Sequence, residues 1–395
     1  MTTVRVLYLH PFGACGGATK SLSEMFAALP AGSVSGLAIA PAGVASRSLE
    51  AAGLQTLHVA GLAQWDDTRF GHYRGLRWLI LLREMAYLPA SILSIVRARR
   101  HGPFDLVHCN EVTALLLGLL AKRWLKAPLV VHVRSLQRGA AGGRISAWLL
   151  GRLRRGADAV VAIDEAVRRT LPQDLPVSVI YNGMRVSADL LVRAADGTFT
   201  VAIIGVLHRA KGVYEFVEAA RLLRDRGVVV KFAVVGDNIR PLSGPRGWLL
   251  RKLDFARDVR ADLQVYVAQH GLEDRVELTG FVADIRTVYS RIDAVCFPSH
   301  LDAPGRPVFE AALFGLPTVV AMREPTHDVI VPDVTGLCIP EPTPAAIADA
   351  IETLAANRER AQRMGALARV LALTRFESSL SAARMLALYR EVLAR

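Results

Sequence analysis

The sequence predicts an α/β fold built from two doubly wound parallel-sheet domains, with one additional helix at the C-terminal end. The 395-residue chain is longer than one ordinary core accommodates. Short apolar runs alternate with helical patterns through both halves, as in strand–helix units with parallel strands. A hydrophobic content of 52% is sufficient for two cores. The predicted boundaries are 1–185 for the first domain, 186–198 for a linker, 199–372 for the second domain and 373–395 for the terminal helix.

Short aliphatic and β-branched runs mark the strands. In the first half they predict strands at Val4–His10, Ser35–Ala40, Leu106–Cys109, Leu129–Val133, Ala159–Ile163 and Val177–Tyr181. In the second half they predict strands at Thr200–Ile204, Lys231–Val235, Val276–Thr279, Ala294–Phe297, Thr318–Ala321 and Gly336–Ile339. A polar interval between the two sets is the predicted linker. The terminal segment, Glu377–Leu393, has apolar residues at helical spacing.

The positive charge is concentrated in the first half. Residues 1–195 hold 23 of the Lys and Arg side chains and 12 of the Asp and Glu side chains, which gives +11 of the chain's net +12. A charge confined to one domain indicates an anionic partner for that domain. Nucleic acid is not favoured, because aromatic residues are not interleaved with the basic ones as a stacking surface requires. The four widely spaced cysteines indicate reduced, buried thiols, neither disulfides nor a zinc site.

The most informative stretch lies between residues 299 and 317. Asp302 stands in a loop rich in Pro and Gly, and Glu310 lies in an apolar stretch, Phe309–Phe314, that predicts a helix. A loop that leads into a helix start presents backbone N–H groups and the positive end of the helix dipole, which together bind phosphate. A carboxylate one turn further on can accept hydrogen bonds from sugar hydroxyls. The combination suits a nucleotide-sugar better than a bare nucleotide.

These residues resemble the donor-site motif of glycosyltransferase family 4, whose members are retaining enzymes of the two-domain GT-B architecture. The resemblance rests on five segments in the family's order: Asp302–Pro317, Gly205–Gly212, Val235–Asp237, the strands with Gly280 and Asp293–Ser299, and Asn182–Gly183. It implies two Rossmann-like domains that face a cleft, with the C-terminal helix crossing back to the N-terminal domain. It also implies that the N-terminal domain receives the acceptor and the C-terminal domain binds the donor.

The resemblance further implies roles for individual residues. The expected catalytic residues are Lys211, Asp302 and Arg134. The expected donor-binding residues are Gly16, Gly17, Gly205, Arg209, Gly305, Arg306, Glu310 and Asp328. The expected acceptor-binding residues are His10, Asn110 and Glu111. A cation such as Lys211 would stabilise charge on the departing diphosphate; taken alone, Lys211 would read as a solvated lysine and Asp302 as a loop-capping aspartate.

Three positions depart from the family pattern. Val206 stands where the family commonly has Arg, so half of a two-cation clamp is missing, and Arg209, His208 or Arg306 are candidate substitutes. Asp302 stands where Glu is usual, and its side chain is one methylene shorter. Asp164 stands where Ser is usual. The departures at Val206 and Asp302 keep a catalytically degenerate binding or scaffold protein as an alternative.

Two basic segments of the first half have amphipathic character. Leu76–Val96 is interrupted by Arg83, Glu84 and Pro89, which argues against a span. The stretch from Ile145 to Arg155 combines Trp148 with several arginines. Both are either ordinary helices packed on a sheet or helices that lie on an anionic membrane. Residues 240–260 form an insertion-like stretch, predicted as a lid or as a contact with acceptor or membrane.

The predicted reaction is transfer of a sugar from a UDP- or GDP-sugar to a hydroxyl acceptor, with retained configuration, in glycolipid or cell-surface polysaccharide synthesis. The predicted partners are the nucleotide-sugar, an acceptor that is lipid-linked or anionic, and an anionic membrane, with no nucleic acid. No cofactor or metal is expected, since cations and helix ends can neutralise the diphosphate. A nucleotide-sugar epimerase is a further alternative. The N-terminal segment runs directly into a strand, so a cytoplasmic location, peripheral on the inner face of the membrane, is expected.

Overall fold

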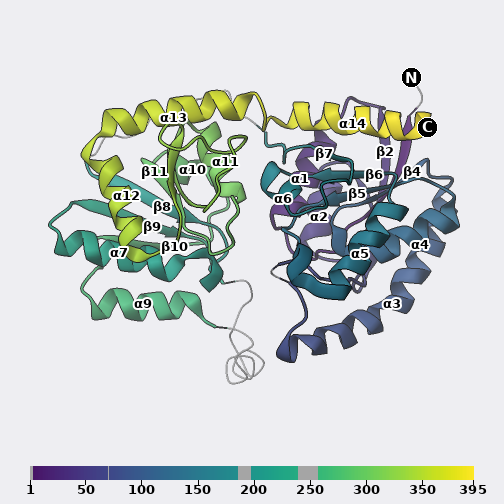
Figure 1. Cartoon of the computed structure of the whole chain (residues 1–395), viewed down its shortest axis with the longest axis horizontal. Coiled ribbons are helices and arrows are strands. Elements are labelled where there is room, and N and C mark those ends of the chain that lie inside the picture. Colours follow the sequence, from purple (N-terminus) through teal and green to yellow (C-terminus); the bar gives the residue numbers. More distant parts are fainter. Residues whose placement is uncertain (1–2, 70, 186–196, 239–256) are drawn as a thin grey trace. The chain divides into compact units, whose positions relative to one another are not determined.

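The computed structural model describes residues 3–69, 71–185, 197–238 and 257–395, which form two compact units (Figure 1). Unit 1 comprises Met1–Val186 together with Arg375–Arg395, and unit 2 comprises Ser187–Thr374. The predicted linker lies outside the described residues except for its last two positions, and so does most of the stretch 240–260. Each unit has its own parallel sheet.

The sheet of unit 1 has seven parallel strands in the order β3-β2-β1-β4-β5-β6-β7. They are β1 (Val4–Leu9), β2 (Val34–Pro41), β3 (Gln55–Val59), β4 (Leu106–Cys109), β5 (Leu129–Val133), β6 (Ala159–Ala162) and β7 (Val177–Val179). The sequence analysis missed β3. This strand pairs with β2 alone, at the edge of the sheet, and its side chains are partly exposed, so it lacks the continuous apolar run of the inner strands.

Helices cover both faces of this sheet (Figure 1). They are α1 (Gly17–Ala27), α2 (Val44–Ala51), α3 (Trp78–Ala98), α4 (Leu115–Leu125), α5 (Gly143–Gly156), α6 (Glu165–Arg169) and α14 (Ser378–Ala394). Side chains alternate along β1: Leu7 and Leu9 join one buried cluster, whereas Val6 and Tyr8 join the other. The second cluster includes Met385 and other residues of α14, so the predicted C-terminal helix is part of the core of unit 1.

The sheet of unit 2 has six parallel strands in the order β10-β9-β8-β11-β12-β13. They are β8 (Phe199–Ile204), β9 (Val230–Val235), β10 (Val276–Gly280), β11 (Ala294–Phe297), β12 (Thr318–Ala321) and β13 (Gly336–Ile339). The helices are α7 (Val213–Asp225), α9 (Val259–Gln269), α10 (Arg286–Tyr289), α11 (Arg306–Leu313), α12 (Pro344–Ala356) and α13 (Arg358–Leu373). The predicted fold class, two Rossmann-like parallel-sheet domains with helices, is confirmed.

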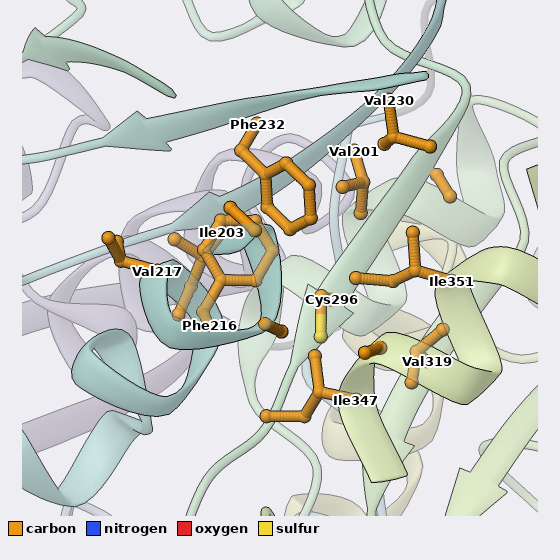
Figure 2. Close-up of a cluster of buried hydrophobic side chains, with 14 of the residues drawn as sticks. Val201, Ile203, Phe216, Val217, Val230, Phe232, Cys296, Val319, Ile347 and Ile351 are labelled. Carbon is orange, nitrogen blue, oxygen red and sulfur yellow. The ribbon is translucent and has the colours of Figure 1, made fainter. Parts of the chain in front are cut away.

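The main core of unit 2 lies between the sheet, α7 and α12. Figure 2 shows Phe216 of α7 beside Phe232 of β9, with Ile347 and Ile351 of α12 and Cys296 of β11 in the same cluster. The rings of Phe216 and Phe232 lie 5.0 Å apart in an edge-to-face arrangement. Burial of one such side chain contributes about 1.5–3 kcal/mol. This packing fixes the strands whose carboxyl ends carry the predicted donor residues.

Candidate active site

The strand order of each sheet reverses once, and the predicted site residues gather at the carboxyl ends of those strands. The reversal falls between β1 and β4 in unit 1 and between β8 and β11 in unit 2. In open α/β sheets, ligands bind outside the carboxyl ends of strands at such a point. Six predicted site residues lie in unit 1: His10, Gly16, Gly17, Asn110, Glu111 and Arg134. The other eight lie in unit 2: Gly205, Arg209, Lys211, Asp302, Gly305, Arg306, Glu310 and Asp328.

The glycines after β1 lie at the start of α1. Gly16 is the N-cap residue and Gly17 the first helical residue, and no side chain caps the helix. A Cβ atom added at either glycine would meet nothing within 4 Å. The packing of unit 1 therefore does not require glycine here. The open space beside the backbone and the uncapped helix start are consistent with the close approach of an anionic group.

Arg134, directly after β5, is the centre of a polar network in unit 1. Its guanidinium donates to the side-chain oxygen of Asn110 at 2.8 and 3.1 Å and to the backbone oxygen of Asn110 at 2.9 Å. It also donates to Asn182 Oδ1 at 2.6 Å and lies 3.1 Å from His132 Nδ1. Asn110 Nδ2 lies 2.9 Å from His10 Nδ1. The structure thus brings together the predicted residues His10, Asn110 and Arg134, and binds them to one another.

Glu111 is 2% exposed and is hydrogen-bonded to the same network. One carboxylate oxygen accepts from the backbone N–H groups of Val112 at 2.8 Å and Arg134 at 3.1 Å, and the other accepts from Ser135 Oγ at 2.8 Å. Burial raises the pKa of this carboxyl above its usual value, and the three donors oppose that shift. Glu111 positions the turn after β5, and its oxygens are engaged in doing so.

The network continues to α14 through residues that the sequence analysis did not identify. The Tyr389 hydroxyl donates to Tyr8 Oη at 3.2 Å and lies 2.8 Å from His108 Nδ1. The rings of His108 and His132 lie 5.7 Å apart. Burial, assisted by the charge of Arg134, lowers the pKa of His10 and of His108 to about 3 and lowers that of His132 as well. These histidines are therefore neutral at pH 7.

Glycines shape the turn after β8 in unit 2. Gly205, Gly212 and Gly236 all have positive φ, of 134°, 73° and 139°. A Cβ atom at Gly236 would lie 1.8 Å from Gly205 O, and one at Gly212 would lie 1.9 Å from Pro298 O. The ends of β8, β9 and β11 thus approach one another more closely than any side chain permits.

Lys211 lies in this turn, in a short 3₁₀ helix, η5 (Arg209–Lys211). Its Nζ is 4.8 Å from the centroid of the Phe297 ring, a cation–π contact. Burial lowers the pKa of the Lys211 ammonium below its usual value. Within the described ranges, no carboxylate lies at ion-pair distance from this ammonium. Arg209, in the same turn, is exposed.

The acidic motif surrounds the start of α11. Asp302 has φ of 54°, in the left-handed region, and its Oδ1 accepts from the backbone N–H of Arg323 at 2.9 Å. Gly305 is the N-cap residue of α11 and has no capping side chain. A Cβ atom at Gly305 would lie 2.2 Å from Phe297 Cζ, so this helix start is packed against the end of β11. Asp328, after β12, is 8% exposed.

One prediction on this helix needs correction. The helix begins at Arg306, three residues before the predicted Phe309, because Pro307 fits the first turn, where its missing N–H is not needed. Arg306 also pairs with Glu310, as its Nε donates to Glu310 Oε1 at 2.6 Å. Tyr289, which the sequence analysis did not identify, donates to Glu310 Oε2 at 2.8 Å and stacks on Phe314. Glu310 is thus held from both sides, and 14% of its side chain is exposed.

The family departure at Asp164 also has a local explanation. Asp164 is the N-cap residue of α6, and its Oδ1 accepts from the backbone N–H of Val167 at 2.7 Å. Serine and aspartate both fill this position well. The described residues contain no group of three or more His, Cys, Asp or Glu side chains placed to hold a metal ion.

Two family models match the chain and together cover both units. "Glycosyl transferases group 1" matches residues 192–370, and "Glycosyltransferase Family 4" matches residues 45–187. With two sheets of this topology and a site at each strand reversal, these matches define the class as a GT-B glycosyltransferase. The chain belongs to glycosyltransferase family 4.

Curated relatives are distant but extend over most of the chain. This chain is 24% identical to the alpha-D-kanosaminyltransferase of Streptomyces kanamyceticus over 340 residues, and the alignment covers 78% of this chain and 83% of that protein. It is 26% identical over 364 residues to the D-inositol 3-phosphate glycosyltransferase of Xylanimonas cellulosilytica, with 86% and 82% covered.

Solved structures share the fold. The crystal structure of Anabaena HepE in complex with UDP and glucose matches with a TM-score of 0.73 and 20% identity, covering 98% of this chain and 99% of that one. Sucrose-phosphate synthase from Thermosynechococcus elongatus matches with a TM-score of 0.70 and 16% identity, covering 99% of each chain. At this level of identity the likeness extends to the fold.

Proposed function

We propose that this glycosyltransferase moves a sugar from a UDP- or GDP-sugar, bound by unit 2, to a hydroxyl acceptor bound by unit 1, with retention of configuration. The observation that carries the proposal is Lys211: a partly buried ammonium without a carboxylate partner in the described part of the chain. An unpaired cation is costly to bury, and a diphosphate would offset that cost.

Several groups around Lys211 suit the rest of a nucleotide-sugar. The uncapped start of α11 at Gly305 presents backbone N–H groups to an anion. Glu310 is oriented by Arg306 and Tyr289, and we propose that it accepts hydrogen bonds from the ribose hydroxyls, as the family resemblance implies. That HepE was crystallised with UDP and glucose supports the same donor class for this chain.

The proposed reaction breaks the bond between the sugar's anomeric carbon and the diphosphate oxygen, which keeps the electron pair. The acceptor oxygen forms the new bond on the same face of the sugar, and its proton leaves to the diphosphate or to solvent. Lys211 stabilises the negative charge that develops on the diphosphate, and loss of such a group typically costs about 10²–10³ in turnover. We propose that no metal is required. Added EDTA should then leave the rate unchanged.

Two observations keep a non-catalytic binding protein as the second candidate. Val206 stands in place of the usual arginine and is 50% exposed, and its aliphatic side chain supplies no second cation in this turn. Asp302 is engaged by the backbone of Arg323 and is shorter than the usual glutamate. A donor that binds without any turnover would favour this candidate. An epimerase would instead change the configuration of the free donor without an acceptor.

The test is a donor screen with purified protein. UDP- and GDP-sugars are compared by thermal shift and by slow hydrolysis, in the wild type, Lys211→Ala and the control Lys231→Ala, which alters an exposed lysine of β9. A donor that binds the native state raises its stability by mass action. The proposal is supported if donors of one nucleotide class stabilise the wild type and are slowly hydrolysed by it, and if both effects are reduced in Lys211→Ala but not in Lys231→Ala. No shift with any donor in folded wild-type protein would contradict it. NMR of the product's anomeric proton tests retention.

A further inference from the structure

The helix α3 buries three polar side chains beside Ile95 and Ala98, and exposes most of its large apolar side chains. Its buried face includes Glu84, Ser91 and Ser94, which are 4%, 0% and 3% exposed. They bind the rest of unit 1: Glu84 Oε2 accepts from the backbone N–H of Gln64 at 3.0 Å, and Ser91 Oγ accepts from that of Ala63 at 2.9 Å. The usual pattern of a surface helix is the opposite.

The opposite face of α3 exposes large apolar side chains. Leu82 and Met85 are 61% and 60% exposed, and the same face includes Trp78, Leu79, Leu88, Leu93 and Val96. Scattered apolar residues are normal on a surface, but a continuous row along a helix of 21 residues indicates a binding surface. We call this face of α3 the apolar stripe.

Only positive charge accompanies the apolar stripe. Exposed arginines flank it at both ends and along its side: Arg74, Arg83, Arg97, Arg99 and Arg100. The one acidic residue between positions 74 and 100 is the buried Glu84, which pairs with Arg83, so among the described residues the other four arginines carry the unpaired charge near the stripe. The helix α5 has the same character. It exposes Ile145 and Trp148, holds Arg152 over the Trp148 ring at 5.3 Å, and contains no acidic residue.

The loop before α3 contacts the first turns of both α3 and α5. Asp67 in that loop accepts from Arg138 Nη1 at 3.2 Å and from Ser146 of α5. Trp65 in the same loop lies 5.5 Å from the Tyr73 ring, which in turn stacks at 5.5 Å on Trp78, the first residue of α3. The starts of α3 and α5 are thus held to one loop of unit 1.

We propose that the apolar stripe of α3, with the exposed face of α5, docks unit 1 on the surface of a bilayer that contains anionic lipid. Apolar side chains with Trp at one end would enter the interface, and the arginines would contact lipid phosphates. A second copy of this chain fits less well, because symmetric packing of two stripes would place arginines against arginines. The proposal goes beyond the transfer reaction and does not depend on the donor.

The geometry favours a helix that lies on the membrane over one that crosses it. Among the described residues, one helical stretch, Trp78–His101, is long and apolar enough to span a bilayer. A span would have to withdraw Glu84 and Ser91 from their backbone partners and place a carboxylate in lipid, which is costly. Docking through the apolar stripe leaves those bonds intact.

The test is flotation of the full chain, without donor, with vesicles of phosphatidylcholine and phosphatidylglycerol or of phosphatidylcholine alone. The variant Leu82→Glu/Met85→Glu changes the apolar stripe. The matched control, Val265→Glu/Val370→Glu, changes two residues of unit 2 helices that are 55% and 63% exposed. We expect flotation at low salt with the anionic vesicles only. The stripe variant should bind at least about tenfold more weakly, because burial of one large apolar side chain contributes about that factor, and the control should bind as the wild type.

Each other outcome overturns the proposal. Failure of the wild type to float with anionic vesicles at low salt would show that the bilayer is not the partner. Equal flotation of the stripe variant would show that another surface binds lipid. A wild-type dimer in light scattering that the stripe variant abolishes, without flotation, would assign the surface to a second copy. Wild-type protein that resists extraction at alkaline pH would indicate a spanning helix.

Discussion

Arg134 in unit 1 and Lys211 in unit 2 are both cations at the carboxyl ends of parallel strands, but their surroundings differ. Arg134 donates to Asn110 and Asn182, and its own backbone N–H is held by the buried Glu111. Lys211 is desolvated, contacts the Phe297 ring and has no carboxylate at ion-pair distance among the described side chains. A cation that is surrounded by acceptors stabilises the fold. A partly desolvated cation without them reduces stability and suits an anionic ligand.

The difference also separates the two halves of the predicted site. In unit 1 the polar residues are hydrogen-bonded to one another, so their side chains are held in fixed positions. In unit 2 the start of α11 has no capping side chain, so its first backbone N–H groups can bind an anion. The following predictions test whether stability depends mainly on the first arrangement and donor binding mainly on the second.

The largest expected effect is a loss of stability in mild acid. Burial and Arg134 lower the pKa of His10 and of His108 to about 3 in the folded state, whereas the unfolded chain has the usual value near 6.5. Below pH 6.5 the unfolded chain therefore binds more protons, and stability is lost as the pH falls from 6.5 towards 3. At pH 5 each of the two residues should cost on the order of 2 kcal/mol.

Urea unfolding followed by tryptophan fluorescence measures this effect, because four of the five tryptophans, Trp65, Trp78, Trp124 and Trp148, lie in unit 1. His108→Gln should reduce the dependence on pH, and substitution of the exposed His101 by glutamine should not. An unfolding midpoint that is the same at pH 7 and pH 5 would show that the network does not hold its histidines neutral.

Next in size is the substitution Arg134→Ala. It orphans the side-chain oxygens of Asn110 and Asn182, and we expect the free energy of unfolding to fall by about 3 kcal/mol. The control Arg323→Ala removes a side chain whose one ion pair is exposed, and should cost less than about 1 kcal/mol. Normal stability of Arg134→Ala with lost turnover would instead assign Arg134 a direct role in catalysis, as the family resemblance implies.

The smallest expected effect is that of Tyr289→Phe. The change removes the hydroxyl that donates to Glu310 Oε2 and keeps the ring stacked on Phe314. Glu310 then keeps only the Arg306 contact, so the KM for the donor should rise about fivefold, which corresponds to about 1 kcal/mol, with kcat nearly unchanged. Tyr214→Phe removes a similar bond, to Asp262, and serves as the control. An unchanged KM would separate Glu310 from donor binding.

The sequence predicted the inner strands and the edge strands β7 and β10, but it did not reveal the edge strand β3. The inner strands are apolar runs, since both faces of the sheets are covered, and these were found. The edge strand β3 pairs on one side only, and its mixed sequence, Gln-Thr-Leu-His-Val, did not reveal it. The start of α11 was placed too late because Pro307 was not recognised as a first-turn residue.

The site shows the same limit. Motif spacing led to the prediction of Lys211, Asp302 and Glu310, which lie in the turn after β8, the loop after β11 and the helix α11. The contact between His108 and Tyr389 joins residues 281 positions apart, and no local pattern signals it. The bond from Tyr289 to Glu310 depends in the same way on how α10 packs beside α11.

The contrast between the two cations is tested most directly by two measurements on the wild type, Lys211→Ala and Lys231→Ala. Calorimetry at low salt gives the affinity of each protein for UDP and for GDP. Denaturant unfolding gives the unfolding free energy of each protein without ligand. If Lys211 binds the diphosphate, Lys211→Ala should bind the nucleotide at least tenfold more weakly, a loss of about 1.4 kcal/mol or more in binding free energy. The stability of Lys211→Ala without ligand should be unchanged or increased. Lys231→Ala should match the wild type in both measurements. Equal affinity in Lys211→Ala, or a stability loss as large as that of Arg134→Ala, would contradict the account.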